Sequence, residues 1–206
     1  MNTSKPRVKF IIEHLEPCSP WILIEYKHAS EIVGKENLII TNVKNREERS
    51  LVKEIANRVY KSSVVDLVDK KEAVVLDPLA ERELRPEDAK FAKYFIFGGI
   101  LGDFNLHGRT YKFITSKLMC EARNLGDKQL SLDGAIFVAK EILFNHKHLK
   151  EIKFVDKLEV EVDDILTIEL PYRYPLHKDR PVVSHELIEF LKKDVVKYEE
   201  YILRNL

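Results

Sequence analysis

Several residue types are scarce in this 206-residue sequence, and their scarcity excludes whole classes of protein. It has only two cysteines, Cys18 and Cys120, which is too few for a disulfide framework and typical of reduced thiols in a cytosolic protein. Lysine plus arginine and aspartate plus glutamate each number 34, which gives a formal net charge of +0. The chain therefore lacks the basic excess of a dedicated nucleic-acid binder, although a neutral total is compatible with a local basic patch.

Long apolar runs are also absent. No run approaches the roughly 20 residues that span a bilayer, and residues 1–9 are polar, without the apolar core of a signal peptide. The hydrophobic content of 45% is nevertheless enough for one sizeable core. We therefore expect a cytoplasmic protein that has no membrane partner.

Glycine is scarce as well, and its distribution is the most informative feature of the chain. The sequence has seven glycines, and six of them lie between Gly98 and Gly134. Three stand in the stretch Phe97-Gly98-Gly99-Ile100-Leu101-Gly102-Asp103, which follows an apolar run. Glycine lets a ligand approach the main chain closely, and open α/β sheets bind ligands at the carboxyl ends of their strands. A second glycine turn at residues 124–131 leads into a helix, so we expect the two turns to form two walls of one pocket.

Apolar periodicity predicts alternating strands and helices before about residue 150. Ser19 and Pro20 mark the start of one helix and Gly34 its end, and Ser131 is the expected N-cap of another. Further helices are expected over residues 46–60 and 109–117. Strands are expected over residues 7–14, 37–41, 64–68, 73–76, 94–97 and 118–122. This alternation predicts an α/β fold with a largely parallel sheet.

The pattern changes after about residue 151. Short strands are expected over residues 152–155, 158–162 and 165–170, and one long helix over residues 184–206. We therefore predict a main domain over residues 1–150 and a C-terminal appendage over residues 151–206.

The glycine turns do not match the common nucleotide-binding motifs. Their Gly-Gly-x-x-Gly spacing differs from the G-x-G-x-x-G of a Rossmann fold, and no Gly-Lys-Ser/Thr follows them as in a P-loop. The first α/β unit, where a Rossmann domain carries its glycines, has none at its turn. From the residues alone, a ligand pocket and ordinary tight turns both stay open.

The motifs instead resemble a SPOUT-class methyltransferase family. Its members include a yeast arginine methyltransferase that acts on a ribosomal protein, and archaeal proteins described as RNA methyltransferases. The three-loop arrangement is also similar to that of the SPOUT tRNA guanine methyltransferase. The resemblance covers almost the whole chain and rests on residues 11–16, Leu76-Asp77-Pro78, residues 85–89, residues 97–103, Arg109-Thr110, residues 125–129, residues 152–156 and residues 171–174. After Asp103 the family carries prolines and charges, whereas this chain has Phe104-Asn105-Leu106-His107-Gly108 in the loop expected to face the substrate.

This resemblance implies a deep trefoil knot around S-adenosylmethionine as cofactor, without a metal. Main-chain groups of the glycine turns would hold the adenine, and apolar side chains would form the walls. The residues expected to bind the cofactor are Leu76, Asp77, Pro78, Phe97, Gly98, Gly99, Ile100, Leu101, Gly102, Arg123, Leu125, Gly126, Gln129, Leu130 and Ser131.

Carboxylates decide the methyl acceptor, because a guanidinium presents a fork of donors that a carboxylate accepts in bidentate fashion. Asp103 is the leading catalytic candidate, and Glu13 and Asp77 are further ones, with Glu16 at a neighbouring strand end. Each has a structural alternative: Asp103 and Asp77 as turn caps, and Glu13 as a surface charge.

Other polar residues have two interpretations each. Arg123 and Arg173 either hold the methionine carboxylate or a substrate phosphate, or are exposed arginines. His14 is either a base or a packed residue at the end of a strand. His146 and His148 lack further ligands at metal spacing, so we expect no metal there.

Three functions stay open at this point. The first is an S-adenosylmethionine-dependent methyltransferase acting on an arginine of a protein substrate, such as a ribosomal protein. The second is the same fold methylating tRNA or rRNA, and the third is a non-catalytic module that binds S-adenosylmethionine. The neutral charge favours protein as the partner, the archaeal family members favour RNA, and both a monomer and a homodimer are compatible with the sequence.

Overall fold

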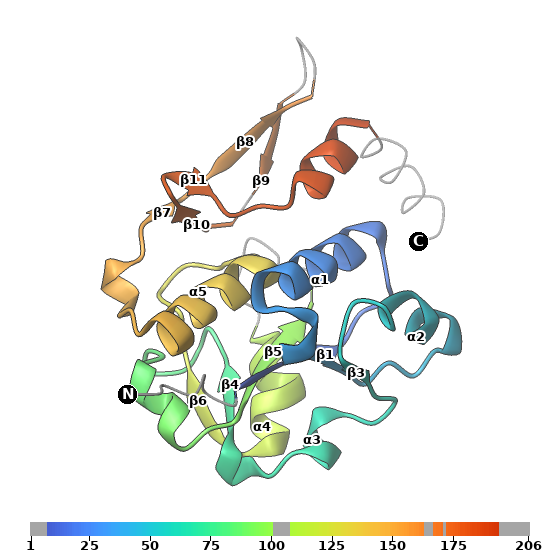
Figure 1. The fold of residues 1–206 in the computed structure, drawn as a ribbon, viewed down its shortest axis with the longest axis vertical. Coiled ribbons are helices and arrows are strands. Elements are labelled where there is room, and N and C mark those ends of the chain that lie inside the picture. Colours follow the sequence, from blue (N-terminus) through green and yellow to red (C-terminus); the bar gives the residue numbers. More distant parts are fainter. Residues whose placement is uncertain (1–7, 101–107, 163–166, 171, 194–206) are drawn as a thin grey trace.

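The computed structural model describes residues 8–100, 108–162, 167–170 and 172–193 (Figure 1). Its main feature is a six-stranded sheet in the order β3-β2-β1-β5-β4-β6, in which every neighbouring pair is parallel. The predicted α/β class with a parallel sheet is thus confirmed. The strands are β1 (Lys9–His14), β2 (Leu38–Thr41), β3 (Arg58–Val59), β4 (Ala73–Leu76), β5 (Tyr94–Gly99) and β6 (Glu121–Arg123).

Helices cover both faces of this sheet. Figure 1 shows α1 and α5 on one side and α3 and α4 on the other. The strands carry apolar side chains on alternate sides: in β1, Phe10 and Ile12 join the core under α1 and α5, and Ile11 joins the opposite core. The helices are α1 (Pro20–Val33), α2 (Arg46–Val52), α3 (Val64–Leu67), a π-helical turn (Tyr111–Thr115) that continues into α4 (Ser116–Leu118), and α5 (Leu132–Asn145).

The two long helices begin where their capping residues predict. The Ser19 hydroxyl accepts the Ile22 N–H at the start of α1, and Gly34 follows its last residue with φ +84. The Ser131 hydroxyl accepts the Gly134 N–H at the start of α5. These side chains satisfy donors that the first helical turn leaves without partners.

Three predicted elements need correction. The helix expected over residues 46–60 ends at Val52, because the chain turns back to pair β3 with β2 at the edge of the sheet. Residues 64–68 do not form a strand: they contain α3, whose first N–H groups are accepted by the side chains of Ser63 and Glu13. The strand expected over residues 118–122 starts at Glu121, because the chain is still helical at Leu118.

The C-terminal residues form small sheets outside the α1–α5 layer (Figure 1). Tyr172, Tyr174 and Leu187 share an apolar cluster with Ile24 of α1, which fixes this part of the chain against the helix layer. Residues 185–193 are helical, and the rest of the helix expected over residues 184–206 lies outside the described residues. The strands are β7 (Phe154–Val155), β8 (Leu158–Glu161), β9 (Thr167–Leu170), β10 (Tyr174–His177) and β11 (Arg180–Pro181). The domain division near residue 150 stays a prediction.

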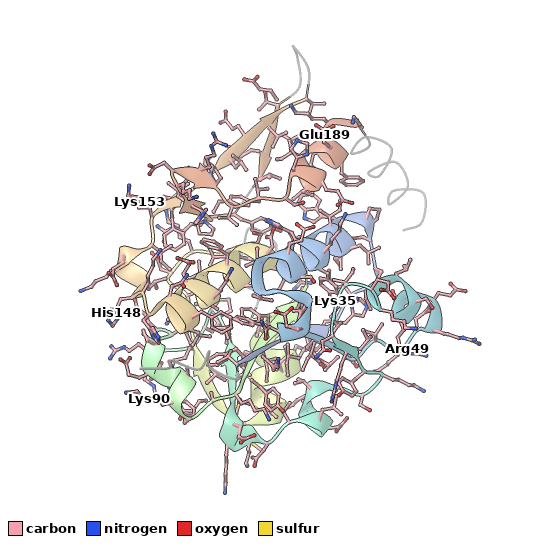
Figure 2. All side chains as sticks on the ribbon, viewed as in Figure 1. Lys35, Arg49, Lys90, His148, Lys153 and Glu189 are labelled. Carbon is pink, nitrogen blue, oxygen red and sulfur yellow. The ribbon has the colours of Figure 1, made fainter. Side chains whose placement is uncertain are left out.

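Charged side chains are spread around the outside of the molecule. Arg49, Lys90 and Lys153 lie at well-separated points of the periphery (Figure 2). Within the described part of the chain, no helix combines the length and the apolarity needed to cross a membrane.

Candidate functional site

A cavity of about 130 Å³ lies at the carboxyl ends of β4 and β5. Residues 76–78, 97–100 and 125–130 converge on it because parallel strands end at the same edge of a sheet. Ten of the expected cofactor-binding residues line this cavity: Leu76, Asp77, Pro78, Phe97, Gly98, Ile100, Leu125, Gly126, Gln129 and Leu130. Leu101, Gly102 and Asp103, also expected in the site, lie outside the described residues.

The loop after β6 is tied to the loop after β4. The Asn124 side chain makes this link. Its Nδ2 donates to the Ala80 carbonyl (2.8 Å), and its Oδ1 accepts the Gly126 N–H (3.0 Å). Gly126 has φ +105, a conformation in which any side chain would be strained. The glycine turn is therefore held in one geometry at the cavity wall.

The neighbouring glycines of β5 face different surroundings. Gly98 lines the cavity, and a Cβ added there would lie 3.3 Å from side-chain atoms of Ile100 and Thr110. A Cβ on Gly99 would lie 2.1 Å from the Tyr26 hydroxyl and 3.0 Å from the Glu13 carbonyl. Gly99 was expected to admit the cofactor, but in the structure it makes room for α1.

One residue of the cavity lining, Gln129, has an unpartnered polar atom. The side-chain oxygen of Gln129 is buried, and it has no hydrogen-bond partner among the described residues. A buried acceptor without a donor costs free energy, so such an atom in a cavity wall indicates a missing donor.

Besides Gly99, two other described residues expected to bind the cofactor lie outside the cavity lining. The Arg123 guanidinium is buried against Asp88, with Nη2 2.9 Å from Oδ1, and Nη1 also contacts Glu121 at 2.7 Å. Ser131 serves as the N-cap of α5, and its hydroxyl lies 2.6 Å from the Asp133 carboxylate. Arg123 thus has structural partners that its sequence position did not reveal, whereas Ser131 was expected as the N-cap of α5.

The two described catalytic candidates also have their carboxylates engaged. Glu13 is buried and accepts hydrogen bonds from the hydroxyls of Thr41 (2.5 Å) and Ser63 (2.6 Å) and from the Val64 N–H (2.9 Å). It is therefore neither the surface charge of the alternative interpretation nor directed into the cavity. Asp77 lines the cavity but accepts the Leu79 N–H (3.0 Å) and the Thr115 hydroxyl (2.6 Å).

Glu16 and Arg109 form an ion pair at the edge of the cavity. The Arg109 guanidinium, which lines the cavity, places Nη1 2.5 Å from Oε1 of Glu16. The Leu15 N–H donates to the Gly99 carbonyl at 3.3 Å, which holds the loop after β1 against the end of β5. Sequence reasoning placed both residues in family motifs but did not foresee their pairing.

His14 belongs to a hydrogen-bonded group beside this edge. Its Nδ1 lies 3.0 Å from the Tyr26 hydroxyl, and its Nε2 lies 3.5 Å from Glu48, which also accepts the Cys18 N–H. The atoms of His14, Cys18 and Glu48 that could ligate a metal ion lie within 4.8 Å of one another. Burial, together with the nearby Glu48 carboxylate, raises the pKa of the Cys18 thiol to about 11. His14 is thus buried at the end of β1, as its interpretation as a packed residue predicts.

Arg173 links the C-terminal segment to the cavity loop. Its N–H donates to the Gln129 carbonyl at 2.9 Å, and its guanidinium contacts Asp127 (3.3 Å) and Asp156 (2.8 Å). The guanidinium carbon also lies 5.0 Å from the ring centre of Phe154. Arg173 therefore stabilises the loop at residues 125–130 by contacts on its outer side.

A buried acidic group supports the start of α5 from the other side. Glu25 of α1 accepts the Trp21 indole N–H at 2.8 Å and the Leu132 N–H at 3.3 Å. Burial, together with the nearby Asp133 carboxylate, raises the pKa of Glu25 to about 8. Asp133 in turn pairs with His28 at 2.6 Å.

Comparison with known proteins assigns this architecture to a family. Residues 9–198 match the family model described as protein arginine N-methyltransferase SFM1-like. The chain is 33% identical to protein arginine N-methyltransferase SFM1 of Saccharomyces cerevisiae, over 91% of this chain and 95% of the yeast protein.

Solved structures agree with this match. The yeast SFM1 structure in complex with SAM superposes with a TM-score of 0.82 at 31% identity, covering 92% of each chain. The structure of the same enzyme with SAH gives 0.81 at 30% identity, covering 89% of this chain and 94% of the yeast one. Trm10 from Thermococcus kodakaraensis shares the fold, with a TM-score of 0.54 at 21% identity over 70% of this chain and 96% of its own. The chain therefore belongs to the SFM1-like family of protein arginine N-methyltransferases.

Proposed function

We propose that this protein binds S-adenosylmethionine in the cavity at the ends of β4 and β5 and methylates an arginine of a protein substrate. One observation carries the proposal: three separate loops meet at one cavity whose wall contains the unpartnered oxygen of Gln129. Family membership and the likeness to yeast SFM1 support it.

The residues of the cavity fit this cofactor. Gly98 and Gly126 leave main-chain groups accessible, and the Gln129 oxygen offers an acceptor for an amine or ammonium donor. Leu76, Leu125 and Leu130 would pack against the apolar parts of the cofactor. S-adenosylmethionine, when bound, supplies an activated methyl group together with its own leaving group. The task of the protein is then to hold and orient both reactants.

The acceptor side needs carboxylates that can pair with a guanidinium. Asp103 stays our proposed catalytic residue there, and it lies outside the described residues. We propose structural roles for Glu13, which caps α3, and for the carboxylate of Asp77, which shapes the turn after β4. We likewise propose that Arg123 and Ser131 support the cofactor loop indirectly.

Finer features stay proposals as well. The ribosomal nature of the substrate and the trefoil knot around the cofactor follow from the family resemblance. An RNA substrate is the second candidate because the Trm10 fold is shared, although that likeness concerns the fold alone.

The cofactor assignment can be tested by calorimetry with S-adenosylhomocysteine. Gln129→Met keeps the size of the side chain and removes the acceptor, so affinity should fall about 5-fold to 10-fold while the melting temperature changes little. Unchanged affinity in the folded variant would show that the cofactor does not contact the Gln129 side chain.

The acceptor can be tested with tritiated S-adenosylmethionine and a cell extract. Label should enter material that protease destroys and RNase leaves intact. Label in RNase-sensitive material would replace the protein acceptor with RNA, and no transfer despite cofactor binding would favour a non-catalytic module.

A further inference from the structure

The ion pair between Glu16 and Arg109 lies at the edge of the proposed cofactor cavity. Arg109 lines the cofactor cavity, and its Nη1 lies 2.5 Å from Oε1 of Glu16. Both side chains are partly open to solvent, with 31% of Arg109 and 27% of Glu16 exposed. The pair is thus within reach of an incoming side chain and is not locked in the core.

The topology places this pair at a characteristic point of the sheet. Chain order reverses between β1 and β5, which are adjacent and central in the sheet. Open α/β sheets bind ligands in the crevice at such a reversal, outside the carboxyl ends of the strands. Glu16 follows β1 closely, and the Leu15 N–H bond to the Gly99 carbonyl fixes its loop against β5.

The other described carboxylates at this edge have structural partners. Glu13 accepts three hydrogen bonds that hold β1, β2 and α3 together, and Asp77 accepts two that shape its turn. Displacing either set would leave buried donors without acceptors, which costs more than the exchange of an exposed partner. Glu16 differs because a guanidinium is among its partners.

We infer that Glu16 is a carboxylate that receives the substrate guanidinium, in addition to the proposed Asp103, and that Arg109 occupies Glu16 until the substrate arrives. This inference rests on the proposed function. The exchange replaces one guanidinium with another, so the carboxylate keeps a charged partner throughout. Glu16 is therefore a specificity residue for arginine, and Arg109 is an internal competitor.

The experiment uses Nα-acetylarginine amide, whose only charge is the guanidinium, with Nα-acetyllysine amide as the control. Binding is measured by NMR titration of the full chain saturated with S-adenosylhomocysteine. Glu16→Gln should weaken binding of the arginine compound about 10-fold to 100-fold, because a charge-assisted hydrogen bond is lost. Glu16→Asp, which retains the charge, should recover part of the affinity.

The Arg109→Gln variant distinguishes the proposed exchange from a purely structural role of the ion pair. Removing the competitor should tighten binding of the arginine compound about 2-fold to 5-fold, the worth of a partly exposed ion pair. Affinity for S-adenosylhomocysteine should stay within about 2-fold in the Glu16 variants, because Glu16 is not part of the cavity lining. A weaker arginine complex for Arg109→Gln would overturn the exchange.

The inference and the proposed function fail in different ways. If the wild-type protein binds the cofactor and methylates protein but Glu16→Gln binds the arginine compound normally, the inference is wrong and the proposed function stands. If the wild-type protein binds no S-adenosylhomocysteine, both are wrong.

Discussion

Substituting alanine at Gly98 and at Gly99 should separate cofactor binding from folding at two adjacent positions. The Cβ of Gly99→Ala would lie 2.1 Å from the Tyr26 hydroxyl, 2.9 Å from an Ile12 methyl and 3.0 Å from the Glu13 carbonyl. The carbonyl belongs to the central strand and cannot yield easily. Overpacking of this kind costs about 1–3 kcal/mol, or about 3–10 °C in melting temperature for a chain of this size.

The Cβ of Gly98→Ala meets only side-chain atoms of Ile100 and Thr110, both at 3.3 Å, which can shift by a few tenths of an ångström. Because Gly98 lines the cavity and these contacts can relax, this variant should keep its stability. Affinity for S-adenosylhomocysteine should fall about 5-fold to 150-fold if the methyl group forces an adjustment of about 1–3 kcal/mol.

Thermal unfolding and calorimetry on both variants provide the assay, and Tyr26→Phe provides the control. Removing the hydroxyl costs its hydrogen bond with His14 but should recover part of the loss in Gly99→Ala, so the double variant should be more stable than the sum of the single effects implies. A Gly99→Ala protein with normal stability and lost cofactor affinity would show that Gly99 faces the cofactor and would refute this reasoning.

Three further substitutions test residues that support the site structurally. Arg123→Met leaves the buried Asp88 carboxylate without its guanidinium and should lower the free energy of unfolding by about 3–5 kcal/mol in urea titrations, whereas a loss below about 1 kcal/mol would contradict a structural role. The raised pKa of Glu25, about 8 against an ordinary 4.5, means that the folded protein keeps a proton that the unfolded chain releases, so stability should fall as the pH rises from 5 to 8. Glu25→Gln should remove this slope, which approaches about 1.4 kcal/mol per pH unit, in denaturation series at fixed pH values. Arg173→Leu should weaken binding of S-adenosylhomocysteine about 3-fold to 10-fold in calorimetry while changing the melting temperature by less than about 3 °C, since the ion pairs it loses are exposed.

The sequence predicted the parts of the fold that depend on local pattern. The strand at residues 94–97 reads as a continuous apolar run because a central parallel strand is buried on both faces. The convergence of residues 76–78, 97–100 and 125–130 was also predictable, since each lies at or just after the end of a strand and parallel strands end at one edge. The cofactor came from the resemblance, because the glycine turns alone also fit ordinary turns.

The features that sequence reasoning missed depend on distant partners. Gly99 looks like Gly98 in the sequence, and only the packing of Tyr26 from α1 separates their roles. Arg123 at the end of β6 forms an ion pair with Asp88, which is distant in sequence, and no local motif indicates this pairing. The short helix α3 did carry a signal in Ser63 followed three residues later by Asp66, which apolar spacing at residues 64–68 obscured.

The order of the strands has a consequence for the growing chain. β1 is the first strand to be synthesised, yet it occupies the middle of the sheet beside β5, which begins at Tyr94. At ordinary rates of translation, β1 waits on the order of ten seconds for that neighbour. During this interval Ile11 and Ile12 lack part of their final cover, and the open edge of β1 can pair with another chain. Nascent chains that stop before β5 should therefore be the most prone to aggregation and the most dependent on chaperones.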